Sequence, residues 1–164
     1  MMTATRGDSA GAFANRLSAT MQLVTFVLGE EEYAIEVSHV CEIVRVRPTT
    51  AIPHSPPFVK GLVNLRNLVV PVIDLRLKLG LEDIPVTKGS RLVVVQLEDR
   101  TAGLIVDSVT GVVRFCEEEV LPIPPTVAEE SIHYMRGILK KDDAFIILLD
   151  VNRLLETREL VGCE

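Results

Sequence analysis

The chain has 164 residues, enough for one or two small globular units. Its 54 valine, isoleucine and leucine residues far outnumber its five phenylalanines and two tyrosines, which predicts an aliphatic core rich in strands. The longest apolar run, Ala144 to Leu149, is far below the about 18–20 residues of a membrane span, and a net charge of −6 argues against binding to nucleic acid.

The first half of the chain alternates strands with turns. Residues 1–20, rich in alanine, threonine, serine and glycine, predict a flexible tail. Apolar runs then predict strands over 21–28, 33–35, 41–46, 60–66 and 68–73. Prolines between 48 and 57 require a loop there. Asp74 has the residue type that caps a helix and Gly80 the type that ends one, so a short helix is expected between them.

The second half follows the same plan. Strands are expected over 91–97, 101–106, 109–115, 136–139 and 144–149, with a proline-rich loop between the third and the fourth. Asp150 opens a short C-terminal helix, and residues 158–164 are expected to form a second tail.

The two halves are alike in detail. Gly61 precedes Asp74 by 13 residues, and Gly137 precedes Asp150 by the same 13. The offset between the halves is 69 residues upstream of the proline-rich loops and 76 downstream. Five strands in each half predict an all-β protein of two small five-stranded barrels, within 21–88 and 89–157, with an exchange of strands between them left open. Units of about 65 residues are marginal alone, so the barrels are expected to pack together.

Comparing the two halves distinguishes residues that the fold requires from candidate functional residues. Asp74 and Asp150 occupy equivalent positions, as do Gly61 and Gly137, so we interpret them as helix caps and backbone requirements. Two charges of the first half have no counterpart in the second. Arg66 stands opposite Asp142, and Glu42 stands opposite Gly111. Each is either a solvated surface charge or part of a contact.

The motifs of enzymes and of metal sites are missing. No phosphate-binding loop, dinucleotide fingerprint, nucleophile elbow or zinc-protease pattern occurs, and the three histidines are isolated. Three widely spaced cysteines provide no disulfide framework, and no signal-peptide pattern opens the chain, so a reducing cytoplasm is expected. The sequence therefore predicts an interaction module without catalytic residues, cofactor or metal.

Several strings resemble the CheW family of bacterial chemotaxis coupling proteins. They are Phe26 to Ile35, Val40 to Ile43, the F-x-K-G-x-x-N-x-R string ending at Arg66, and the P-V-x-D-L-R string ending at Arg76. The resemblance covers about residues 21–157. It implies two SH3-like five-stranded barrels acting as an adaptor between the cytoplasmic tips of chemoreceptors and the regulatory domain of the histidine kinase CheA. It also implies a cytoplasmic protein recruited to receptor arrays without inserting into the membrane.

The resemblance also implies a binding surface. It points to Val40, Glu42, Gly61, Arg66 and Asn67 as kinase- or receptor-binding positions, with Glu42 and Arg66 paired across the sheet. The family usually has glycine where this chain has Asn67, and asparagine tolerates the positive φ that such a turn needs.

The sequence is also compatible with other functions. The chain could serve a chemosensory-like pathway without flagellar output, or derive from the related modules of CheA or CheV. A small-barrel nucleic-acid binder would need a basic, aromatic face, which this composition does not favour.

Overall fold

The computed structural model describes residues 20–124 and 132–156. Of the predicted N-terminal tail only Thr20 lies in this part, and it already belongs to a strand. The predicted C-terminal tail and part of the second proline-rich loop lie outside the described residues. No helix in the described ranges is long and apolar enough to cross a bilayer.

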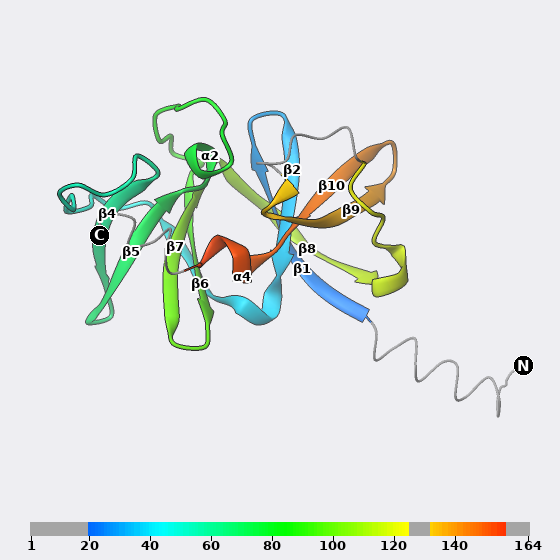
Figure 1. Ribbon diagram of the computed structural model, residues 1–164, viewed down its shortest axis with the longest axis horizontal. Helices are drawn as coiled ribbons and strands as arrows, with labels where there is room; N and C mark the ends of the chain where they lie inside the picture. Colours follow the sequence, from blue (N-terminus) through cyan, green and yellow to red (C-terminus); the bar gives the residue numbers. More distant parts are fainter. Residues whose placement is uncertain (1–19, 125–131, 157–164) are drawn as a thin grey trace, which may run out of the picture.

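Two five-stranded sheets form the molecule, which confirms the all-β prediction (Figure 1). The first sheet has the order β8-β1-β2-β10-β9, with bounds Ser108–Cys116, Thr20–Leu28, Glu31–Glu36, Ala144–Leu149 and Met135–Lys141. The second has the order β3-β6-β7-β5-β4, with bounds Val40–Arg45, Arg91–Leu97, Arg100–Val106, Leu68–Asp74 and Val59–Leu65. Short helical turns connect them: η1 (Val37–His39), α2 (Leu75–Lys78), η2 (Glu117–Glu119) and α4 (Val151–Leu154).

The sequence repeat is also a structural repeat. Strands β1 to β5 correspond in order to β6 to β10, and replacing each strand of one sheet by its counterpart yields the order of the other sheet. Each sheet contains one parallel pair, β10 with β2 and β5 with β7, and these pairs are equivalent too. Both sheets contain strands from both halves of the chain, so β3 and β8 each pair with strands of the opposite half.

An isolated bridge draws the two edges of each sheet together. Past β3, Thr50 exchanges two backbone hydrogen bonds with Leu62 on β4. Past β8, Leu121 does the same with Ile138 on β9. In each sheet the chain leaving one edge strand therefore reaches the other edge strand, which curls the sheet toward a barrel.

The repeated glycines and aspartates support these connections. A Cβ on Gly61, at φ 138°, would lie 2.2 Å from the carbonyl oxygen of Thr50, and one on Gly137 would lie 2.9 Å from that of Leu121. The Asp74 carboxylate accepts hydrogen bonds from two backbone N–H groups of α2, and Asp150 accepts one from α4. The interpretation of all four residues as parts of the fold is confirmed.

The largest apolar cluster lies at the seam between the sheets. It joins Phe26 and Ile35 of the first sheet to Ile73 and Leu104 of the second, and Leu154 of α4 packs there as well. Two smaller clusters fill the individual sheets. The largest cluster is therefore shared by the two sheets, as expected for units that are marginal alone.

Candidate interaction site

Glu42 and Arg66 meet where the two edges of the second sheet approach each other. Glu42 lies on edge strand β3, and Arg66 lies in the turn between β4 and β5. Arg66 Nη2 is 3.4 Å from Glu42 Oε1, so the predicted pairing is confirmed. The arginine side chain is 83% exposed and the glutamate 25%. An exposed pair of this kind stabilises a fold by at most about 1 kcal/mol, so its main effect is to orient the arginine.

The turn that carries Arg66 is a tight two-residue hairpin. Leu65 pairs with Leu68, and between them Arg66 and Asn67 have φ values of 53° and 65°. Positive φ at both central residues is the pattern of a type I′ turn, which asparagine tolerates well. Leu68 and Val69 follow and are more than half exposed. We call the exposed tip of this hairpin, formed by Arg66, Asn67, Leu68 and Val69, together with Glu42 the hairpin face.

Val40 and Gly61 are not part of this surface. Val40 is half-buried at the start of β3 and packs against the cluster at the seam. A bulge at Cys41 separates it from Glu42. Gly61 is buried under the Thr50 carbonyl and presents no side chain. Of the five residues singled out from the sequence, Glu42, Arg66 and Asn67 thus share one exposed surface.

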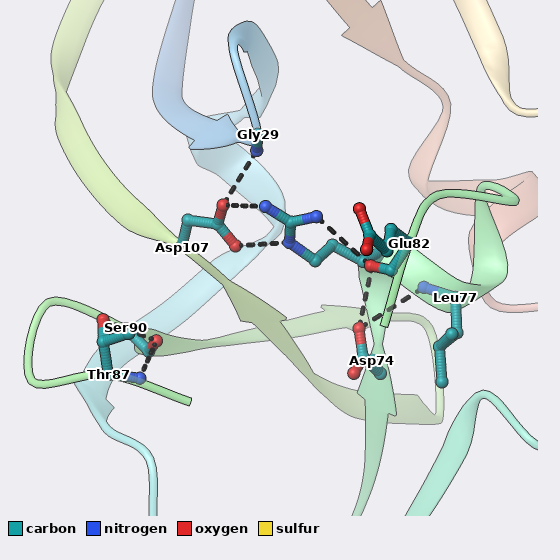
Figure 2. Close-up of polar contacts among 8 residues, drawn as sticks. Gly29, Asp74, Leu77, Glu82, Thr87, Ser90 and Asp107 are labelled. Carbon is teal, nitrogen blue, oxygen red and sulfur yellow. Dashed lines mark hydrogen bonds and ion pairs between the residues drawn. The ribbon is translucent and has the colours of Figure 1, made fainter. Parts of the chain in front are cut away.

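A partly buried ion pair, which the sequence analysis did not predict, connects the two sheets. Arg76 donates from Nε to Asp107 Oδ1 at 2.9 Å and from Nη2 to Asp107 Oδ2 at 2.6 Å (Figure 2). The backbone N–H of Gly29, in the β1–β2 turn of the first sheet, donates to the same carboxylate at 2.8 Å. Arg76 also donates to the Glu82 carbonyl, so α2, the β7–β8 junction and the β1–β2 turn meet at this ion pair.

Different hydrogen bonds connect α4 to β7, at the position that is equivalent by the repeat. Arg100, at the start of β7, donates to the Leu155 carbonyl and to Asn152 Oδ1, both at 2.9 Å. Asn152 is the repeat counterpart of Arg76, and Ser38 is the counterpart of Asp107. The Arg76–Asp107 pair therefore breaks the repeat as Glu42 and Arg66 do, and that signal could have revealed it.

The acid stability of the protein should depend on Asp107. The hydrogen bonds from Arg76 hold the pKa of Asp107 below its usual range, against the opposing effect of burial. A depressed pKa means that the stabilisation is complete above the unfolded value of about 3.9 and is lost as the pH falls through the folded value. Below about pH 4, wild type should lose unfolding free energy more steeply than Asp107→Asn. Urea titrations from pH 7 to pH 2.5 measure this, and parallel curves would contradict it.

No side-chain arrangement for catalysis emerges from the described residues. Within residues 20–124 and 132–156, no three histidine, cysteine or acidic side chains are grouped to hold a metal ion. His133 Nε2 lies 2.8 Å from Glu156 Oε1, a pair that is about one third exposed. What the arrangement offers is an exposed hairpin on a body of two packed sheets.

Comparisons with known proteins agree with this picture. Residues 22–159 match the CheW-like domain. The chemotaxis protein CheW of Helicobacter pylori is 34% identical over 148 residues, covering 90% of this chain and 89% of that protein. Its counterpart in Treponema pallidum is 33% identical over 143 residues, covering 85% and 84%. The crystal structure of the scaffolding protein TtCheW from Thermoanaerobacter tengcongensis superposes with a TM-score of 0.76 at 36% identity, covering 85% of this chain and 94% of that one.

Proposed function

The chain belongs to the CheW-like family, and we propose that it couples chemoreceptors to the histidine kinase CheA, with the hairpin face as its kinase-binding surface. Proteins of this family are adaptors and not enzymes, so the chemistry it serves is performed by its partners. The observation that carries the assignment of the surface is the Glu42–Arg66 pair, because it orients an exposed arginine on a tight hairpin.

The composition of the hairpin face suits a protein partner. Leu68 and Val69 supply apolar area, and Arg66 and Asn67 supply donors beside it. Arginine beside exposed apolar side chains is typical of residues that dominate binding energy at protein interfaces. The CheW-like regulatory domain of the kinase is the partner we propose for this face.

The receptor tip is proposed to bind nearer the seam. Val40 lies between the hairpin face and the central apolar cluster, so a helical tip lying along β3 would contact both sheets. In this arrangement Gly61 contributes shape through its backbone instead of a side-chain contact. The adaptor would work in the cytoplasm, recruited to receptor arrays through these two contacts.

Arg66→Ala should weaken binding of the kinase regulatory domain at least about tenfold, because arginines at the centre of an interface commonly contribute 1–2 kcal/mol or more, by rough estimate. The melting temperature should stay within about 2 °C of wild type, because the pair it loses is solvent-exposed. Isothermal titration with the purified domain and a thermal melt of each variant measure both quantities.

Arg114→Ala is the matched control for this experiment. Arg114 is also an exposed arginine, but it lies on β8 of the other sheet. If Arg66→Ala bound the kinase domain with unchanged affinity, the hairpin face would not be the kinase-binding surface. A large loss of thermal stability would instead make Arg66 a structural residue.

A further inference from the structure

Four basic residues lie at the end of the second sheet where β3 ends and β6 begins. Arg45 and Arg91 are direct partners in the last register pair of the β3–β6 ladder. Arg47 follows two residues after Arg45, and Arg91 donates from Nη1 to the Lys88 carbonyl at 2.9 Å. We call the surface formed by Arg45, Arg47, Lys88 and Arg91 the basic end. The hairpin tip at Arg66 precedes β5, whereas Asp74, at the far end of β5, lines a groove together with Arg47.

The charges of the basic end are not compensated within the described part of the molecule. No carboxylate among residues 20–124 and 132–156 lies within 4.0 Å of any of the four cations. Like charges directly opposite each other in an antiparallel ladder destabilise the sheet. The repulsion between Arg45 and Arg91 therefore destabilises this end of the sheet, although the protein as a whole has a net charge of −6. A bound anionic group would offset that repulsion.

The repeat shows that the barrel architecture does not require all of these cations. The equivalent register pair in the first sheet is Gln22 with Arg114, which carries one positive charge instead of two. Cys116 stands where the second sheet has Arg47. The basic end thus departs from the repeat at Arg47 and Arg91, whereas Arg45 has an arginine as its counterpart. The two departures indicate a role outside the fold.

A groove of about 240 Å³ opens beside the basic end. Arg47 and Lys60 supply its cations, and the exposed side chains of Ile84 and Val86 form apolar walls. Two carboxylates also line it. Asp74 is occupied in capping α2 and lies 3.9 Å from Lys60, whereas Asp83 is exposed. The two cations of the groove are balanced by these two carboxylates, so the surplus of positive charge lies beside the groove, at Arg45, Lys88 and Arg91. A ligand that spans both would combine apolar side chains in the groove with negative charge on the basic end.

We propose that the basic end and its groove bind an acidic peptide segment of a partner protein, with carboxylates on Arg45 and Arg47 and an apolar side chain between Ile84 and Val86. A peptide fits better than a nucleic acid because the groove walls are aliphatic and the chain is acidic overall. The proposal is independent of the kinase contact at the hairpin face.

The test uses a labelled peptide of alternating glutamate and leucine, with a glutamine–leucine peptide of equal length as reference. In an NMR titration of the full chain, the acidic peptide should shift the amide signals of Arg45, Arg47, Lys88 and Arg91. Arg45→Glu combined with Arg47→Glu should weaken binding at least about tenfold, since each exposed charge contact is modest but both are reversed. Salt at about 0.5 M should weaken the wild-type complex as well.

Arg114→Glu is the matched control, because it makes the same charge reversal at the equivalent position of the first sheet. It should bind the acidic peptide as wild type does. Equal binding of the glutamine–leucine peptide, or unchanged affinity in the double reversal, would overturn the proposal. Equally tight binding of duplex DNA or of phosphatidylglycerol vesicles would replace it with a general polyanion surface. Kinase binding measured on the same double variant should be retained, which keeps this result separate from that of Arg66→Ala.

Discussion

Replacing Arg76 by alanine is expected to lower the free energy of unfolding by about 2 kcal/mol. Removing one partner of a buried pair commonly costs about 3–5 kcal/mol, and partial exposure of Asp107 reduces that figure. The Arg76 side chain is only 10% exposed, against 33% for Asp107. The variant leaves that carboxylate with the single backbone donor of Gly29 and detaches α2 from the β1–β2 turn. The melting temperature should fall by about 4–8 °C in a thermal scan.

Two further variants separate the ion pair from a general effect of losing an arginine. Arg114→Ala removes an exposed arginine and should melt as wild type does. Arg76→Met combined with Asp107→Leu should recover part of the loss, since replacing both members of a buried pair by apolar groups removes the unpaired charge. If Arg76→Ala melted at the wild-type temperature, the two sheets would be held together by the apolar cluster at the seam alone.

Much of the fold could be predicted because its determinants are local. Alternating apolar residues define the strands, and Asp74 and Asp150 cap their helices through side-chain oxygens within the same turn. The pairing of β3 and β8 with strands of the opposite half could not be predicted. Either strand shows the same alternation whichever sheet receives it, so the choice is made by packing at the seam and not by the local pattern.

Site residues could be predicted where a residue of one half differs in charge from its counterpart in the other half. Glu42 and Arg66 were found in this way, and the structure places them 3.4 Å apart. The same comparison applied to Arg76 and Asp107 would have revealed the ion pair at the seam. The basic end was hidden for a different reason. Net charge averages over the whole chain, so a value of −6 conceals four cations that the fold brings together from distant segments.

Gly61→Ala should be the most destabilising of the substitutions considered, by roughly 3–5 kcal/mol, because steric overlap and backbone strain add. The new methyl group would lie 2.2 Å from the Thr50 carbonyl oxygen and 2.7 Å from its carbon, both backbone atoms that cannot rotate away. The φ of 138° is strained for any residue with a Cβ. The bridge between Thr50 and Leu62 must therefore open, and with it the closure of the second sheet.

Gly80→Ala is the control that isolates the overlap. Gly80 also has a positive φ, 82°, but a Cβ there meets nothing within 4 Å, so the cost should be only about 1 kcal/mol. Both variants are measured by urea denaturation and by titration with the kinase domain at the same temperature. Together the two measurements show whether Gly61 affects binding through the stability of the fold or through a direct contact. Because Gly61 presents no side chain, its variant should lose affinity in proportion to the unfolded fraction, whereas Arg66→Ala should lose affinity while folded. A Gly61→Ala protein that melts as wild type does and yet fails to bind would make Gly61 a direct contact.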